Sequence, residues 1–212
     1  MTRTTILVPQ GAEAEAVRRA RPAARVVALP PGAAAAGALP DFEDAETAVV
    51  LGLCGGLWRL TAGDVSVYGR VVDAAGAIDL DPHLVDELTR ALPHAVVANA
   101  CTTKRVITAV DARVALAQRF NADVVDMEGT HLARALGERG ARFAMVRVVS
   151  DDASRDLPPL DDAIDARGRI QPMPVALAFA RAPLAALAFV RGVRSSLGVL
   201  TETARAINRV PV

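Results

Sequence analysis

Acidic side chains follow two apolar runs of this chain, at the positions where buried strands would end. Asp126 and Glu128 follow the first run, and Ser150, Asp151 and Asp152 follow the second. Open α/β sheets bind ligands beyond the carboxyl ends of their strands, so these carboxylates could face a ligand. A carboxyl group enclosed beside other acids keeps its proton to higher pH, which suits general acid catalysis. The alternative is that they cap the following helix or turn, because a carboxylate oxygen accepts a free backbone N–H.

Two other stretches have residue types suited to a binding site. Glu13 and Glu15 lie at the start of an expected helix, where acidic residues also stabilise the helix dipole without any further role. Gly55 and Gly56 follow a buried run, and paired glycines let a ligand approach backbone N–H groups closely. A tight turn is the simpler interpretation of this pair, because the sequence has neither a GxGxxG motif nor a P-loop there.

Runs rich in β-branched residues alternate with helical patterns along the chain. Strands are expected within residues 4–9, 25–29, 48–53, 64–74, 94–100, 122–127 and 142–150, and helices within 12–20, 81–92, 109–120 and 129–140. Alternation at these lengths predicts an α/β fold, with a central mixed β-sheet in a three-layer αβα domain. The Pro/Gly/Ala-rich residues 29–44 and the polar residues 151–172 are expected to be loops.

The composition excludes several classes of function. The 212 residues suffice for one α/β core, and we expect a single domain over residues 1–212. Positive and negative side chains number 24 each, so no charge excess indicates nucleic acid or an anionic membrane as partner. Cys54 and Cys101 lie in apolar surroundings without metal-ligand spacing, which predicts reduced thiols, a cytoplasmic location and no metal site. The first residues do not resemble a secretory signal.

The most apolar stretch, residues 172–193, begins a C-terminal tail that we expect to be helical from about residue 172. It is interrupted by two prolines and two arginines, and its uncharged runs fall short of the roughly 18 residues of a membrane-spanning helix. Packing on the domain or in a subunit interface is one explanation of such helices. The other is an apolar lip containing Phe179 and Phe189, which receives a greasy substituent and touches the membrane surface through its flanking arginines. In that case, removal of residues 172–212 should leave the fold intact.

Four motifs occur together in the order and spacing of one family. They are LCGGL at 53–57, Gly63-Asp64, VVDMEG at 124–129 and VRVVSDD at 146–152. The chain resembles the nucleoside phosphorylase and nucleosidase superfamily, which includes purine nucleoside phosphorylases and methylthioadenosine/S-adenosylhomocysteine nucleosidases. The short length and the apolar tail are similar to those of its hopanoid-associated branch, whose members are linked to removing adenine from adenosylhopane. The resemblance therefore implies cleavage of the N-glycosidic bond of an adenine nucleoside with a bulky 5′-substituent.

The resemblance implies a role for each residue of its two most specific motifs. Glu128 would accept hydrogen bonds from the ribose 2′- and 3′-hydroxyls, and Met127 would pack beneath the sugar. Asp151 would be the general acid that protonates N7 of the purine, with Arg147 and Ser150 orienting it. No covalent intermediate is implied, because the base departs from an oxocarbenium-like sugar that water or phosphate captures.

Other residues match the family less closely. Glu15, or Glu13 because the alignment is loose there, matches the residue that activates water in the nucleosidases. Val106 and Ile107 match the apolar wall around the base. Asp126 replaces a glutamate that is usual in the family, and we assign it no direct chemistry.

Departures from the family pattern bear on the nucleophile. Phosphorylases usually have a serine in the glycine loop and an N-terminal arginine, which hold phosphate. Here Leu53 and Cys54 precede the glycines, and the first seventeen residues contain one arginine, Arg3. Arg59 or Lys104 could substitute, but nothing in the sequence requires it. Hydrolysis is therefore favoured, with phosphate as an alternative co-substrate and no other cofactor.

The resemblance also implies a homo-oligomer that binds a small purine nucleoside and no nucleic acid. A nucleosidase acting on soluble methylthioadenosine-like substrates is an alternative function. A nucleoside sensor without turnover is another, although the presence of both Glu128 and Asp151 argues against it. His83, His94 and His131 have no matching partners and are expected to be structural or exposed.

Overall fold

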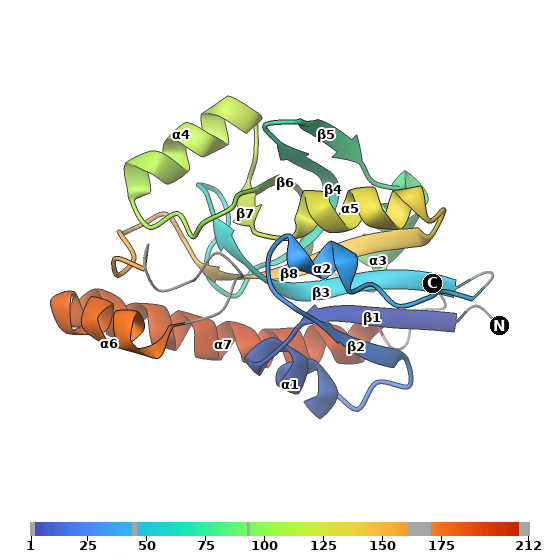
Figure 1. Cartoon of the computed structure of the whole chain (residues 1–212), viewed down its shortest axis with the longest axis horizontal. Helices are drawn as coiled ribbons and strands as arrows, with labels where there is room; N and C mark the ends of the chain where they lie inside the picture. The colour runs from blue at the N-terminus through green and yellow to red at the C-terminus, as the bar shows by residue number, and fades with distance from the viewer. Residues whose placement is uncertain (1–2, 44–45, 93, 161–170, 208–212) are drawn as a thin grey trace.

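The computed structural model describes residues 3–43, 46–92, 94–160 and 171–207 (Figure 1). Their strands are β1 (Arg3–Pro9), β2 (Arg25–Leu29), β3 (Glu46–Gly56), β4 (Val65–Asp73), β5 (Gly76–Asp79), β6 (Ala95–Thr102), β7 (Val124–Asp126) and β8 (Arg142–Asp151). Their helices are α1 (Ala12–Arg19), α2 (Ala34–Gly37), α3 (Pro82–Ala91), α4 (Val110–Phe120), α5 (Gly129–Glu138), α6 (Pro172–Arg181) and α7 (Pro183–Ile207). The prediction of an α/β fold around a central mixed sheet is confirmed.

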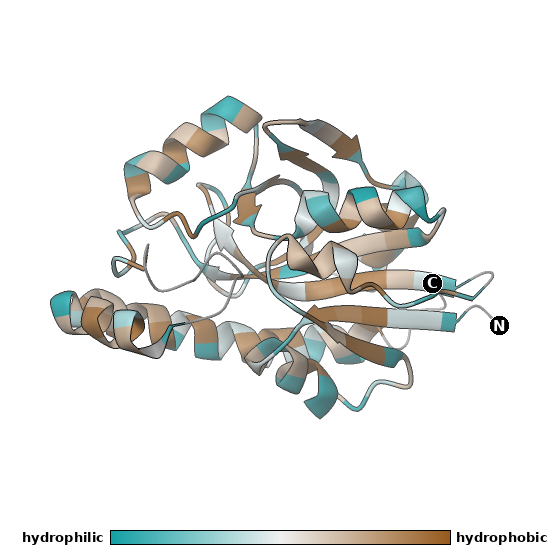
Figure 2. Cartoon of the chain, in the orientation of Figure 1, coloured by the Kyte–Doolittle hydropathy of each residue, from teal (hydrophilic) through white to brown (hydrophobic). Residues whose placement is uncertain are grey.

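The central strands are continuous apolar runs because both of their faces are covered. β1 and β8 run parallel to β3 on either side of it, and the middle residues of all three strands are buried. Figure 2 shows these strands as largely apolar, with hydrophilic residues concentrated at the surface ends and on the helices. In Figure 1, α1 and α7 lie on one side of the strands, and α2 and α5 lie on the other. This arrangement places the carboxyl ends of β1, β3 and β8 at one edge.

The strand pairing closes on itself around β3. β3 pairs with β8 along most of its length, and its last residues, Gly55 and Gly56, pair antiparallel with β7. β7 then pairs with β6, β6 with β4, and β4 with β8. The interpretation of the glycine pair as a tight turn is therefore wrong, because both glycines belong to a strand. The register makes Gly55 the partner of both Val125 and Asp151, which brings two of the sequence motifs into contact.

Two short elements were not predicted. α2 lies within the expected loop at 29–44, whose position 44 is outside the described residues. β5 folds back on β4 through a turn at Gly76, whose φ of 142° is a conformation that side-chain-bearing residues rarely adopt. Part of the second predicted loop, residues 161–170, also lies outside the described residues.

The C-terminal half of α7 belongs to the core of the protein. Leu200, Ala204 and Ile207 are buried in the main hydrophobic cluster, and α7 packs on β8 and α1. The expectation that residues 172–212 could be removed without loss of the fold is therefore wrong. By length and composition alone, α7 is the one helix among the described residues that could cross a membrane. Its buried C-terminal half instead serves as a layer of the α/β fold.

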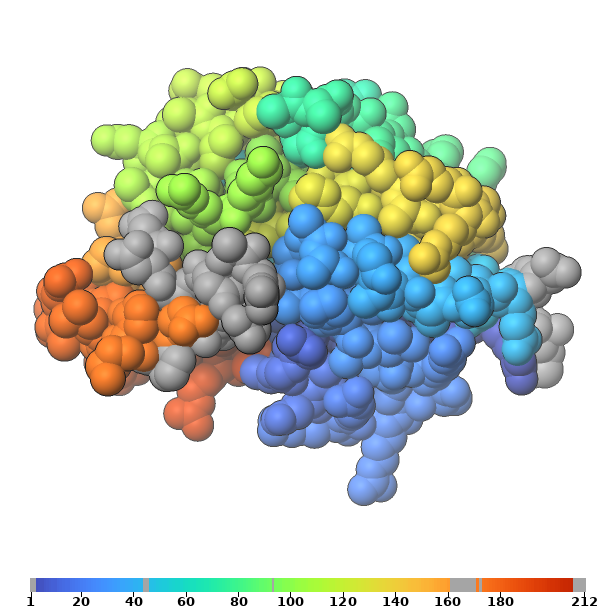
Figure 3. Space-filling view, viewed as in Figure 1, coloured from blue at the N-terminus to red at the C-terminus, as the bar shows by residue number. Residues whose placement is uncertain are grey.

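α6 and the first half of α7 form one end of the molecule, which we call the terminal hairpin (residues 172–192). Figure 1 shows this hairpin, in orange and red, extending past the ends of the strands, and Figure 3 shows it at one end of the molecule. Four large apolar side chains on it are exposed to solvent: Met173, Leu177, Leu184 and Leu187. The hairpin thus differs from the rest of α7 in presenting apolar surface outward.

Candidate active site

A cavity of about 650 Å³ opens where the carboxyl ends of the central strands meet. The β3 end contributes Leu53, Cys54 and Gly55, and the first helix contributes Glu13. The remaining lining includes three of the four acidic positions predicted from the strand ends: Asp126, Glu128 and Asp151. Residues from motifs far apart in the sequence therefore face one space. Its volume falls within the range of small-molecule sites, about 300–1,000 Å³.

Glu128 lies at the junction of β7 and α5 with only 8% of its surface exposed. Its Oε1 accepts a hydrogen bond of 2.8 Å from the backbone N–H of Gly32, in the Pro/Gly/Ala-rich segment after β2. Burial raises the pKa of Glu128, opposed by the nearby Arg147. Oε2 faces Arg147 at 3.6 Å. The Glu128 carboxylate is thus held in place and partly desolvated, and the residue lines the cavity.

Asp126 has the capping role that was considered for it. Its Oδ1 accepts hydrogen bonds from the N–H of Gly129, the first residue of α5, at 3.0 Å and from Thr102 Oγ1 at 2.8 Å. Its Oδ2 has no hydrogen-bond partner among the described residues and lies 4.0 Å from an Arg147 nitrogen. Asp126 therefore anchors the start of α5 and adds negative charge beneath Glu128.

Arg147 lies beneath the carboxylates and is fully buried. Burial by itself would lower the pKa of its guanidinium, but the carboxylates of Asp126 and Glu128 raise it. None of its side-chain nitrogens has a hydrogen-bond partner among the described residues. The prediction that Arg147 orients Asp151 is wrong, since its ion pairs are with Asp126 and Glu128.

Gly52 in β3 leaves the space that Arg147 occupies. A Cβ atom at this position would lie 2.1 Å from Arg147 Nη1 and 2.8 Å from Glu13 Oε1. Both distances are too short for any side chain, so only glycine allows the guanidinium and the Glu13 carboxyl to approach the strand. The sequence analysis did not single out this glycine.

Glu13, and not the preferred Glu15, lines the cavity. Glu13 Oε1 accepts a hydrogen bond of 2.6 Å from the N–H of Leu53, and burial raises its pKa to about 7. The Glu15 side chain is 67% exposed and lies 3.5 Å from Arg19. The helical pattern contained a signal for this choice, because Glu13 is four residues before the buried Val17 and so shares its face.

Asp151 ends β8 on the other side of the cavity from β1 and α1. Ser150 Oγ donates a hydrogen bond of 2.6 Å to its Oδ1, and the orienting role of Ser150 stays a prediction. Its Oδ2 pairs with Arg113 Nη2 at 2.5 Å. The neighbouring Asp152 accepts the N–H of Ser154 in a turn and does not line the cavity.

Arg113 is the site residue that the sequence analysis missed. It lies on α4, is 1% exposed, and forms the ion pair with Asp151 across 38 residues of sequence. An arginine within an amphipathic helical pattern normally faces solvent, so its residue type gave no signal. Only the tertiary structure shows that α4, which packs near β6, directs this side chain to the ends of β3 and β8.

The remaining predicted contact residues fall into two groups. Val106, Ile107, Met127 and Gly55 line the cavity, and their contacts with a nucleoside stay a prediction. Gly56 is not part of the lining, and its backbone carbonyl accepts a hydrogen bond from Arg113. A further group of side chains forms an apolar wall of the same cavity: Leu160, Val175, Phe179 and Phe189.

Cationic groups are scarce in the cavity. Arg105 is the one basic residue of its lining within the described part of the chain. Arg59 instead pairs with Asp123 and lies over the ring of Trp58. Lys104 is exposed and is not part of the lining. No group of three His, Cys, Asp or Glu side chains suited to a metal ion occurs among residues 3–43, 46–92, 94–160 and 171–207.

Comparison with known proteins identifies a family for this chain and solved structures of similar fold. A family model described as the phosphorylase superfamily matches residues 29–171 of this chain. No curated protein matches the sequence. Native futalosine hydrolase of Helicobacter pylori strain 26695 superposes with a TM-score of 0.72 at 12% identity, covering 97% of each chain. The 5′-methylthioadenosine/S-adenosylhomocysteine nucleosidase from Neisseria meningitidis, in complex with methylthio-immucillin-A, gives a TM-score of 0.71 at 14% identity, covering 99% of this chain and 100% of that chain.

Proposed function

Because this chain belongs to the phosphorylase superfamily, we propose that it cleaves the N-glycosidic bond of a purine nucleoside, with water as the nucleophile. One observation carries the proposal. A single cavity holds Asp151 together with the apolar wall of Val106 and Ile107, and it also holds the carboxyl groups of Glu13, which is partly buried, and of Glu128, which is buried. A purine against that wall can receive a proton from Asp151 while its ribose reaches the two glutamates.

At the base, Asp151 supplies the proton that lets the purine leave. The proton passes from the Asp151 carboxyl to N7, the C1′–N9 bond breaks, and its electron pair leaves with the neutral base. Ser150 and Arg113 contact one oxygen each, so the carboxyl plane is fixed before the base binds. A fixed acid avoids reorganisation during the reaction, which is where such a group lowers the barrier.

At the sugar, Glu128 accepts hydrogen bonds from the two ribose hydroxyls. Each carboxylate oxygen has two lone pairs, so Oε1 can serve the ribose while it accepts the N–H of Gly32. Positive charge builds on the sugar as the base departs, and charge-assisted hydrogen bonds strengthen with it. Met127 lies next to Glu128 in the lining and supplies the apolar surface beneath the ribose.

Glu13 takes a proton from the attacking water. Its pKa of about 7 is that of a base poised at neutral pH. The water oxygen forms the new bond to C1′, so the products are the free base and a ribose with its original 5′-substituent. Phosphate as nucleophile is less favoured, because Arg105 is the one basic residue of the described cavity lining. Arg59, which was considered as a phosphate ligand, is already paired with Asp123.

The 5′-substituent of the substrate is proposed to be large and apolar. The wall of Leu160, Val175, Phe179 and Phe189 joins the cavity to the terminal hairpin, whose outer surface is also apolar. Such a wall gains free energy by burying hydrocarbon, at about 25 cal/mol per Å². Adenosylhopane fits this requirement, and its triterpenoid would place the enzyme at the surface of the inner membrane. A homo-oligomer in the cytoplasm remains a prediction from the family resemblance.

The test is direct incubation of the purified protein with adenosine, methylthioadenosine and adenosylhopane, each with and without phosphate. We expect adenine release without phosphate, fastest with adenosylhopane presented in vesicles. In ¹⁸O-labelled water, one labelled oxygen should appear at C1 of the sugar product. If adenine release depends absolutely on phosphate, the nucleophile is phosphate and not water. Binding of all three nucleosides without adenine release would instead indicate a sensor.

A further inference from the structure

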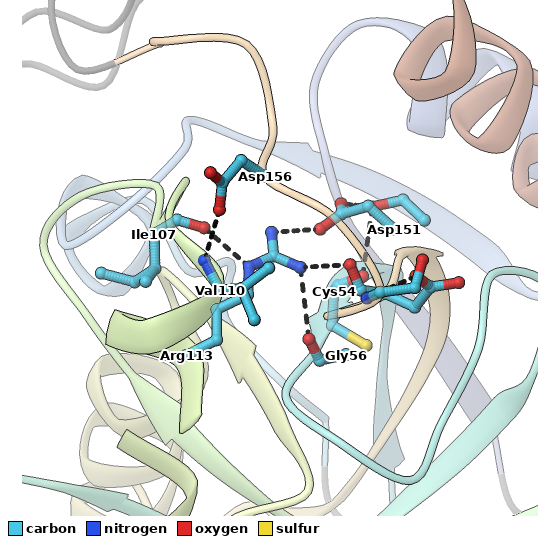
Figure 4. A network of polar contacts seen from close by, with 10 residues as sticks. Cys54, Gly56, Ile107, Val110, Arg113, Asp151 and Asp156 are labelled. Carbon is cyan, nitrogen blue, oxygen red and sulfur yellow. Dashed lines mark hydrogen bonds and ion pairs between the residues drawn. The ribbon is translucent and has the colours of Figure 1, made fainter. Parts of the chain in front are cut away.

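Arg113 makes four hydrogen bonds at the base of the cavity (Figure 4). Its Nε donates to the carbonyl of Ile107 at 2.8 Å, and its Nη2 donates to Asp151 Oδ2 at 2.5 Å. Its Nη1 donates to the carbonyls of Gly56 at 3.3 Å and Asp152 at 3.0 Å. One buried guanidinium therefore contacts the ends of β3 and β8 and the segment that precedes α4.

The contacts beside Arg113 join the same two segments. Asp156 Oδ1 accepts the N–H of Val110 at the start of α4, at 2.8 Å. The N–H of Leu157 donates to the carbonyl of Thr108 at 2.9 Å. The chain leaving β8 is thus fastened to the segment that contains Val106 and Ile107. Arg113 lies inside this seam and contributes a positive charge to it.

The pairing with Asp151 is closely fitted. A Cβ atom on Gly55 would lie 3.2 Å from Asp151 Oδ2 and 3.7 Å from Arg113 Nη2, so glycine leaves room for the pair. The Asp151 side chain is 11% exposed, on the side of the cavity. An arginine with four fixed acceptors has little freedom to move away from its carboxylate partner.

We propose that Arg113 is a positioning residue for base release, an inference that rests on the proposed nucleoside cleavage. When Asp151 gives its proton to N7, the carboxyl group becomes a carboxylate that faces the Arg113 guanidinium. The buried guanidinium stabilises the negative charge that develops on Asp151. Its hydrogen bond to the Ile107 carbonyl fixes Asp151 relative to the apolar wall against which the base lies. Arg113 acts through Asp151 and does not touch the nucleoside.

The substitution Arg113→Gln tests this role. We expect kcat for adenine release to fall by about 10- to 100-fold, with KM changed much less, because loss of the cation weakens general acid catalysis without removing the base wall. Hydrolysis of 4-nitrophenyl β-D-ribofuranoside should be nearly unaffected, since its leaving group departs as a stable anion and needs no proton. In an Asp151→Asn background, Arg113→Gln should cause little further loss, because both changes disable the same unit.

The controls separate positioning from a structural role. Arg119→Gln removes an arginine of the same helix that stacks on Phe120, and it should leave both substrates unaffected. Arg113→Lys keeps the charge but not the four-bond geometry, so it should restore adenine release in part and provides a second variant if Arg113→Gln does not fold. Any of three results would overturn the proposal. They are equal losses of activity on both substrates, additive effects in the double variant, and failure of both Arg113 variants to fold.

A binding measurement keeps this inference distinct from the proposed function. If the wild-type protein releases no adenine from any nucleoside, the proposed function fails. Calorimetric titration with free adenine still measures the coupling between Arg113 and Asp151. Asp151→Asn and Arg113→Gln should each weaken adenine binding. The double variant should bind adenine no more weakly than the more affected single variant. Adenine binding that is insensitive to Arg113→Gln would overturn the positioning role.

Discussion

At the scale of single residues, the glutamate end of the cavity holds more negative than positive charge. Glu13, Asp126 and Glu128 surround one buried guanidinium, that of Arg147. Burial raises the pKa of both Glu13 and Glu128, and Arg147 only partly opposes it. A sugar that acquires positive charge would relieve this imbalance, so the site should bind the transition state better than the neutral nucleoside.

Asp151→Asn should nearly abolish base release while nucleoside binding survives. Asparagine keeps the shape and can accept the Arg113 hydrogen bond, but it cannot deliver a proton, which typically costs about 10²–10⁴-fold in rate. Single-turnover adenine release and equilibrium nucleoside binding, on protein checked by thermal denaturation, measure the two effects. Asp152→Asn is the matched control and should behave as wild type, because Asp152 serves a turn. Wild-type turnover by the Asp151 variant would remove Asp151 from the mechanism.

Glu13→Gln should make the protein inactive and, above neutral pH, more stable. The pKa of Glu13 is about 7 in the folded protein and 4.5 for an ordinary glutamate, so between these values the folded protein holds a proton that the unfolded chain has lost. The free energy of unfolding of the wild type therefore decreases as pH rises from 4.5 through about 7. Glutamine does not titrate, so the variant should gain up to about 3 kcal/mol over wild type at pH 8 and almost nothing at pH 4.

Urea unfolding at both pH values and adenine release at pH 7 measure these two effects of Glu13→Gln. Glu15→Gln is the control, and neither its stability nor its activity should change much, because Glu15 is exposed. A variant at position 13 that is active, or that is no more stable at pH 8 than wild type, would contradict the assignment of Glu13 as the base.

Glu128→Gln should lower kcat more than it weakens nucleoside binding. The amide can still hydrogen-bond the ribose hydroxyls in the ground state, but it lacks the negative charge that opposes the positive sugar in the transition state. Steady-state kinetics with adenosine and direct binding of adenosine to an Asp151→Asn background separate the two effects. An effect confined to KM would show that Glu128 only binds the substrate.

At the scale of elements, β3 holds the site together because each of its last residues meets a different partner. Gly52 faces Arg147 and Glu13, Gly55 faces Asp151, and Gly56 offers its carbonyl to Arg113. α4, α5 and α1 then each bring one functional side chain, or its anchor, to this strand. The closed pairing of β3, β7, β6, β4 and β8 keeps these ends at fixed spacing.

Gly52→Ala should reduce both stability and activity. Its methyl group would overlap Arg147 Nη1 at 2.1 Å, and the buried guanidinium cannot move without breaking its ion pairs. Overpacking of this kind typically costs about 1–3 kcal/mol. Gly198→Ala, on the exposed face of α7 with open space around it, is the control and should stabilise by about 0.5–1 kcal/mol. Urea unfolding measures the free energy of unfolding of both variants, which should change in opposite directions. Wild-type stability of Gly52→Ala would show that Arg147 has room to shift.

At the scale of the whole molecule, the terminal hairpin combines an apolar inner wall with an apolar outer surface. Met173 and Leu184 are 79% and 83% exposed, whereas Phe179 and Phe189 line the cavity. Arginines at positions 181 and 191 flank these stretches. Apolar side chains bordered by arginines suit an interfacial position, in which the charged groups reach lipid headgroups.

Replacing the four exposed apolar residues of the hairpin by glutamine should impair action on membrane-held substrate only. The variant combines Met173→Gln, Leu177→Gln, Leu184→Gln and Leu187→Gln. We expect it to lose flotation with liposomes and to act more slowly on adenosylhopane in vesicles, with soluble adenosine turned over as by wild type. Val114→Gln, at an exposed position on α4, is the control. Equal activity of the fourfold variant on both substrates would refute membrane docking through this surface.

The secondary structure was largely predictable because its signals are local. The run at 142–150 is a strand at Arg142–Asp151, and the pattern at 129–140 is a helix at Gly129–Glu138. Buried strands are continuous apolar runs, and an amphipathic helix has apolar residues at intervals of three to four positions. The acidic residues at the ends of β7 and β8 could be found in the same way, since a strand end is a local feature.

Tertiary structure alone decided which of these residues act together. The Arg113–Asp151 pair spans 38 residues of sequence, and the Gly32–Glu128 hydrogen bond spans 96. Such contacts depend on strand register and helix docking, which no local pattern encodes. Residue type and spacing therefore determined that carboxylates stand at the strand ends. The tertiary structure decided that Arg113 pairs with Asp151, whereas Arg147 pairs with Asp126 and Glu128. A buried charge can pair only with the partner that the fold brings within reach.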